Sequence, residues 1–222
     1  MRNSILLFII FLTACRQTQT TKMAFHFYPG IADSLREKYL HREIRQAQLF
    51  NLPVIYKGVD SFEMRVRYWD VFDMGINLCV LKLDSMGWKG YHYDSYTLFH
   101  QKEDGIHVTR TDTYNIGDSV FLVNEFTPLC GWQKFADSLI SFKLESLPTQ
   151  DSIKNFKSVR GFTDGDGYNI EISTRHSYKM LSYFMPEYSP YSECKTVTAF
   201  IAFLKRQLGE KYDWPKNLPS TK

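Results

Sequence analysis

The chain has 222 residues, of which 44% are hydrophobic and 23% are charged. A chain of this length and composition can bury a substantial core as one ordinary domain. Its net charge of +3 comes without a run of like charge, so the sequence carries no basic patch of the kind that binds nucleic acid.

The first fifteen residues have the layout of a secretory signal. Arg2 supplies a short positive region, residues 5–12 form an unbroken apolar run, and small residues lead to Cys15. The run is too short to span a bilayer as a helix. An ordinary secretory signal or a buried strand would share this run. The terminal cysteine and the polar stretch after it favour a lipoprotein signal.

Leu12-Thr13-Ala14-Cys15 resembles the lipobox of bacterial lipoproteins. The resemblance implies that signal peptidase II cuts before Cys15 and that the sulfur of Cys15 carries a diacylglycerol. Residues 1–14 would then be the signal peptide and residues 15–30 a tether to the membrane.

The residues after the lipobox bear on location. Arg16 stands where an aspartate would imply retention in the inner membrane, so the resemblance implies the periplasmic face of the outer membrane. Residues 16–20 also lack the acidic side chains of a surface-export signal. The inner membrane and the cell surface stay open as alternatives.

An amphipathic helix is predicted next, ending near Phe50. Ser34 and Glu37 have the spacing of a capping box. Asn51-Leu52-Pro53 stops the helix. Apolar side chains recur on one face, at Leu35, Tyr39, Leu40, Ile44 and Ala47.

Alternation typical of strands follows, and four strands in an antiparallel meander are predicted over residues 62–69, 76–83, 88–101 and 106–113. The strand at 76–83 is apolar on both faces, so we expect it to be central. Asp104-Gly105 predicts the last hairpin turn. Residues 120–126 fit either a fifth strand or a buried segment.

The last predicted elements are a helix over 132–144, a long loop over 149–167, strands over 168–173 and 178–185, and a helix over 192–209. Strands in runs beside helices predict an α+β fold, with a mainly antiparallel sheet and helices packed on one face. We expect one domain over residues 31–212 and a tail over 213–222.

Three cysteines remain if Cys15 is lipidated: Cys79, Cys130 and Cys194. Export leads to a compartment where disulfides form, but three cysteines cannot all pair within one chain. Cys194 lies on the same apolar face of the predicted helix as Val197, so we expect Cys194 to be buried and to act as a small hydrophobic residue. If a bridge exists, Cys79 with Cys130 is the expected pair, although the sequence does not determine the pairing.

Two patterns resemble parts of metal sites. Asp164-Gly165-Asp166-Gly167 resembles part of a calcium-binding loop. Ser173 stands where an EF-hand loop has its bidentate glutamate, so a glycine turn that leads into a strand is the favoured interpretation. His100 and His107 would be diagonal neighbours in a hairpin, without an evident third zinc ligand. We therefore predict no metal and no cofactor.

Aromatic residues with polar tips gather on the predicted strand at 88–101. Such rings present a large contact area at low entropy cost, so the expected partner-binding residues are Tyr91, His92, Tyr93 and Tyr96. The same residues are ordinary strand formers, and a structural role is the favoured interpretation. Tyr91 and Tyr93 should face one side, and His92 and Asp94 the other.

No motif for a nucleophile elbow, a zinc protease, a phosphate loop or a dinucleotide site occurs, so enzyme activity stays undecided and a non-enzymatic role is favoured. The small exported body is similar in style to lipoproteins of Bacteroidota-type bacteria, which implies no function. We expect a membrane-anchored module that binds a protein or envelope component. The alternatives are an inhibitor or immunity lipoprotein against a toxin or wall hydrolase, and a glycan hydrolase that pairs Glu171 with Glu125 or Asp166.

Overall fold

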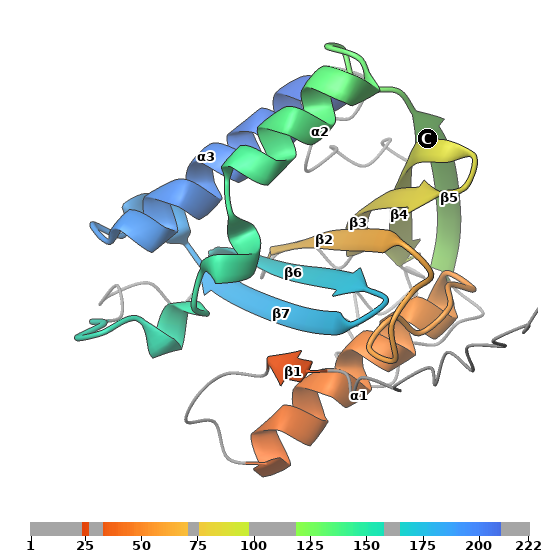
Figure 1. Cartoon of the computed structure of the whole chain (residues 1–222). Coiled ribbons are helices and arrows are strands. Elements are labelled where there is room, and N and C mark those ends of the chain that lie inside the picture. Colours follow the sequence, from red (N-terminus) through yellow and green to blue (C-terminus); the bar gives the residue numbers. More distant parts are fainter. Residues whose placement is uncertain (1–23, 27–32, 71–75, 98–118, 158–164, 210–222) are drawn as a thin grey trace, which may run out of the picture.

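The computed structural model describes residues 24–26, 33–70, 76–97, 119–157 and 165–209 (Figure 1). Its strands are β1 Ala24–His26, β2 Phe62–Asp70, β3 Ile76–Asp84, β4 Gly87–Thr97, β5 Ser119–Phe126, β6 Asp166–Thr174 and β7 Ser177–Phe184. Its α-helices are α1 Asp33–Leu49, α2 Trp132–Ser141 and α3 Ser192–Leu208. Short 3₁₀ turns occur at Leu144–Ser146, Gln150–Ser152 and Pro186–Tyr188.

One seven-stranded sheet runs through the described residues in the order β1-β7-β6-β2-β3-β4-β5. β1 is parallel to β7 at one edge, and all other neighbouring strands are antiparallel. With its three helices the domain is α+β and its sheet is mainly antiparallel, as predicted. β3 lies between β2 and β4, which confirms the prediction that this apolar strand is central.

The meander is confirmed for its first three strands, β2, β3 and β4. Its fourth strand, residues 106–113, lies outside the described residues, as do His100, His107 and the Asp104-Gly105 turn. The ambiguous segment near residue 120 is strand β5, which pairs with β4. At Gly90 of β4 an added Cβ would lie 2.6 Å from the ring of Phe126, so glycine is needed for this ring to rest on the neighbouring strand.

The helices are divided between the two faces of the sheet (Figure 1). α2 and α3 cover the face that carries Met64, Val66 and Ile170, which belong to the main core together with Phe135 of α2. α1 covers the opposite face, where the ring of Phe50 meets Tyr93 edge-on at 5.3 Å between centroids. The expectation that helices pack on one face therefore holds for α2 and α3 only. Alternation makes the charged side of β2 resemble a solvated face, but α1 buries it.

Helix α3 is held by a stripe of side chains that are each at most 5% exposed: Cys194, Val197, Ile201, Leu204 and Leu208. Ser192 is the first helical residue, and Tyr191 occupies the cap position. At the other end Gly209 has a φ of 81°, which favours glycine where the helix stops. Lys205 and Arg206 in the last turn suit the negative end of the helix dipole.

All three described cysteines are free thiols, so the predicted Cys79–Cys130 bridge is wrong. Cys79 points from β3 into the core, whereas Cys130 is partly exposed in the turn before α2, where its backbone N–H donates to Gln207 Oε1. Burial raises the pKa of the Cys79 thiol far above its ordinary value, which keeps it protonated and inert. Cys194 is fully buried, as predicted.

Adjacent residues of α2 allow a matched test of the core. Leu139 is 5% exposed and Ile140 is 69% exposed. Leu139→Ala should lower the free energy of unfolding by about 2–5 kcal/mol, because it leaves a cavity in the core. Ile140→Ala should change it by less than about 0.5 kcal/mol. Urea denaturation of both variants measures the difference, and equal losses would contradict the placement of α2.

Candidate functional site

Five buried charged side chains lie together between α1 and the sheet. They are Glu43 of α1, Glu63, Arg65 and Arg67 of β2, and Glu171 of β6, and each is at most 4% exposed. The strand residues share one face because side chains alternate along a strand, and Arg65 is the register partner of Glu171. We call these five residues the buried charge cluster.

The helix enters the cluster through Glu43, whose two carboxylate oxygens each have a partner on the sheet. Arg67 Nη1 donates to Glu43 Oε2. Asn169 Nδ2, on β6, donates to Glu43 Oε1 at 3.4 Å. Charge-assisted contacts of this kind are strong in a buried setting, so they position α1 over β2 and β6.

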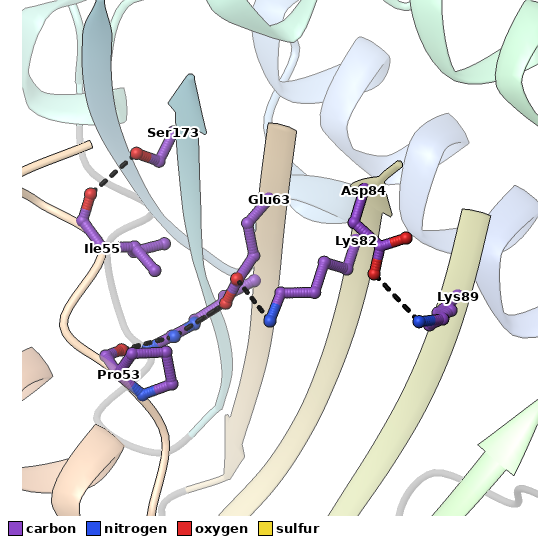
Figure 2. Close-up of polar contacts among 8 residues, drawn as sticks. Pro53, Ile55, Glu63, Lys82, Asp84, Lys89 and Ser173 are labelled. Carbon is purple, nitrogen blue, oxygen red and sulfur yellow. Dashed lines mark hydrogen bonds and ion pairs between the residues drawn. The ribbon is translucent and has the colours of Figure 1, made fainter. Parts of the chain in front are cut away.

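The loop that follows α1 is tied to the same face (Figure 2). Arg65 Nε donates to Glu63 Oε1 at 2.8 Å, and Arg65 Nη2 donates to the carbonyl oxygen of Pro53 at 2.6 Å. Ser173 Oγ donates to the carbonyl oxygen of Ile55 at 2.7 Å. From the rim, Lys82 Nζ lies 3.5 Å from Glu63 Oε2. The bond to Ile55, a fully buried residue, satisfies a backbone carbonyl that would otherwise be buried without a partner.

Glu171 has the most perturbed acidity in the cluster. Burial, together with the nearby negative charge of Glu43, raises the pKa of Glu171 to about 7. Arg67, Arg65 and a hydrogen bond donated by Tyr178 Oη, 2.7 Å from Glu171 Oε1, oppose the rise. Three carboxyl groups and two guanidinium groups are buried here, so a proton on Glu171 balances the cluster at mildly acidic pH.

A carboxyl group of raised pKa beside a carboxylate is also the arrangement of a general acid in a hydrolase. In this protein the two groups are the side chains of Glu171 and of Glu43 on α1, and both are buried and hydrogen-bonded to other side chains. The sequence-based partners of Glu171 do not meet it: Asp166 precedes it on β6 but has the parity of the opposite face, and Glu125 is on β5, four strands away in the sheet order. Sequence reasoning missed Glu43, for which the one available signal was the run of alternating charges on β2.

A second polar pair lies on the α2 and α3 side of the sheet. His92 and Asp94 of β4 are 0% and 2% exposed, with His92 Nδ1 3.4 Å from Asp94 Oδ2. A carboxylate at Nδ1 orients an imidazole, as in histidine bases. Register places Cys79 opposite His92 and Asn77 opposite Asp94. Burial raises the pKa of the Cys79 thiol and keeps it protonated, so Cys79 is not an activated nucleophile beside His92.

Of the four residues predicted to contact a partner, the three with described side chains do not form one surface. Tyr91 is half-buried on the α1 side, Tyr93 is 8% exposed and packs on Phe50, and His92 is buried on the other side. The predicted alternation of the two faces is therefore confirmed. Tyr96 belongs to β4, and its side chain lies outside the described residues. Tyr91 stays a candidate for partner binding.

Beside α1, strands β4 and β5 present an accessible area that we call the outer sheet face, made of Lys89, Tyr91, Val123 and Glu125. Tyr91 and Glu125 are register partners. The pKa of Lys89 is raised, mainly by its hydrogen bond to Asp84 and also by the negative charge of Glu125. Val123 is 55% exposed. Lys89 Nζ also pairs with Asp84 Oδ2 at 2.9 Å, as Figure 2 shows. An aromatic ring, an aliphatic side chain and both signs of charge make this area suitable for contact with a protein.

The calcium-like segment lies partly outside the described residues, which exclude Asp164. Asp166 and Gly167 begin β6. Among the described residues, no group of three or more His, Cys, Asp or Glu side chains is arranged to hold a metal ion.

The Glu43–Arg67 pair can be tested by removing one partner and then both. Arg67→Met should destabilise the fold by about 3–5 kcal/mol, because it leaves the charge of Glu43 buried without its guanidinium. The double variant Glu43→Leu, Arg67→Met should recover most of this loss in urea denaturation. Asp84→Asn, at the solvent-exposed pair with Lys89, serves as the control and should leave stability nearly unchanged. Additive losses would show that the pair is not coupled.

No protein-family model, curated protein or solved structure matches this chain. In the part of the chain that the structure describes, no helix is both long and apolar enough to cross a membrane.

Proposed function

We propose that the protein is a lipid-anchored lipoprotein of the bacterial envelope whose α+β body binds a protein or envelope component without catalysing a reaction. The lipobox-like motif supports the anchor at Cys15, and the part of the predicted 15–30 tether that precedes β1 supplies the link to the body. Arg16 after the lipidated cysteine favours the periplasmic face of the outer membrane.

The burial of the candidate acid–base groups favours a binding function over a catalytic one. The groups best suited to acid–base chemistry are built into the interior: Glu171 is bonded to Tyr178 beneath α1, and His92 pairs with Asp94 against the main core. The outer sheet face, by contrast, presents Val123 and part of the half-buried Tyr91 to solvent. Rings and aliphatic groups within a mixed-charge surface favour contact with another macromolecule.

The anchor is tested by substituting the cysteine of the lipobox. Cys15→Ala should abolish labelling by a fatty-acid analogue and release the protein from the membrane fraction, since the thioether link cannot form. Cys130→Ala is the matched control, because it removes a partly exposed cysteine of the body and should leave label and location unchanged. Persistence of both in Cys15→Ala would end the lipoprotein proposal.

The binding role is tested by photo-crosslinking in cells. A photoreactive phenylalanine in place of Tyr91 should give one discrete adduct, because this position belongs to the outer sheet face. The same substitution at Tyr188, which is 59% exposed in the turn before α3, should give none. Tyr91→Ala should weaken binding of the purified partner by roughly ten-fold or more, the scale of an interface hot spot.

The identity of the adduct separates the alternatives. A toxin or wall hydrolase whose activity falls on binding would make the protein an inhibitor or immunity lipoprotein. Release of sugars from purified cell wall by the protein alone, lost in Glu171→Gln, would replace the binding proposal with a glycan hydrolase. Equal crosslinking from Tyr91 and Tyr188 would exclude the outer sheet face as the binding site.

A further inference from the structure

Helix α1 rests on the sheet through two different kinds of contact. At its C-terminal end Phe50 joins a small apolar cluster with Leu78, Val80 and Tyr93. In its middle the contact is charged, with Glu43 held by the sheet. Among the side chains that the structure describes, this apolar cluster is small beside the main core under α2 and α3, so we expect the docking of α1 to depend on the state of the charges.

The charged contact is incompletely satisfied. Within the described residues Gln46 Oε1, Arg67 Nε and Asn169 Oδ1 are buried without a hydrogen-bond partner. Each such atom costs free energy relative to its hydration in water. Undocking α1 would hydrate these atoms as well as the charges, which lowers the cost of separating this interface.

Charge balance makes this interface sensitive to protons. Glu171 faces Glu43 from α1, Arg65 and Arg67 from β2, and the hydroxyl of Tyr178 from β7. When all three carboxyl groups of the cluster are ionised, they exceed the two guanidinium groups that are buried with them. The remaining cation, Lys82, has a side chain that is 38% exposed, so solvent weakens its attraction for Glu63.

We propose that the docking of α1 on the sheet depends on a proton held in the buried charge cluster, and that loss of this proton releases α1 while the other described strands, α2 and α3 stay folded. The proton leaves the carboxyl group of Glu171 for solvent. The released face carries Arg67 and Asn169, which are bonded to Glu43 of α1 in the docked state.

The direction of the pH effect follows from linkage. The pKa of Glu171 is raised from 4.5 to about 7 when α1 is docked, so the docked state holds this proton more tightly than an open state in which the carboxyl group is hydrated. The stabilisation is therefore complete below pH 4.5 and is lost as the pH rises towards 7. Between pH 6 and pH 8.5 the equilibrium constant for opening should increase roughly ten-fold.

Hydrogen exchange of the full chain, followed by mass spectrometry, tests this proposal. Exchange times are scaled so that the extent of intrinsic chemical exchange is the same at pH 6 and pH 8.5. In the parent chain, peptides covering residues 40–50 of α1 should lose about ten-fold in protection at the higher pH, whereas peptides covering 194–208 of α3 should not. Glu171→Gln cannot ionise and should abolish the pH effect, and Asp84→Asn should retain it.

A second variant guards against failure of Glu171→Gln to fold. Glu43→Gln removes the neighbouring negative charge but not the burial of Glu171, so its α1 should be less protected at both pH values and should show a smaller pH dependence than the parent chain. The proposal is overturned if either folded variant keeps the pH dependence of the parent chain. It is also overturned if α1 and α3 lose protection together, or if the protection of α1 does not change with pH.

Discussion

The charges of β2 are the constraint on which the arrangement of the helices depends. β2 is the middle strand of the sheet, and its alternation sends Met64 and Val66 to one side and Arg65 and Arg67 to the other. α2 and α3 cover the apolar side by ordinary core packing. Guanidinium groups can be buried only where carboxylates and carbonyls meet them. The helix on the second side therefore has to bring a carboxylate, Glu43, and the loop after it a carbonyl.

Local patterns were sufficient to predict most of the elements, because period-two alternation and helical stripes report which side chains are apolar. β2, β3 and α3 were predicted in this way. The same patterns could not predict where α1 packs. A glutamate among polar helix residues is expected to face solvent, and the bond from Arg67 to Glu43 joins residues 24 positions apart in the sequence. The absence of a Cys79–Cys130 bridge likewise depends on burial in three dimensions, on which the spacing of cysteines carries no information.

At the candidate site, too, local pattern predicted the faces of the strand but not the contacts made in three dimensions. Alternation correctly separated Tyr91 and Tyr93 from His92, but it could not tell that Phe50 covers Tyr93 while Tyr91 stays partly open. Both faces of β4 are covered, so His92 is buried on the side of the main core and Tyr93 on the side of α1. Among the described side chains of β4 and β5 on this face, Val123 and Glu125 are exposed and Tyr91 is partly so.

The short strand β1 fixes the point at which the N-terminal segment joins the body. Its three residues run parallel to β7 at one edge of the sheet, and β5 occupies the opposite end of the strand order. With neighbouring strands about 4.8 Å apart, the two ends of the sheet are separated by roughly 25–30 Å. A chain anchored through Cys15 would therefore join the body at the edge of the sheet farthest from β5, so the outer sheet face lies across the sheet from the point of attachment.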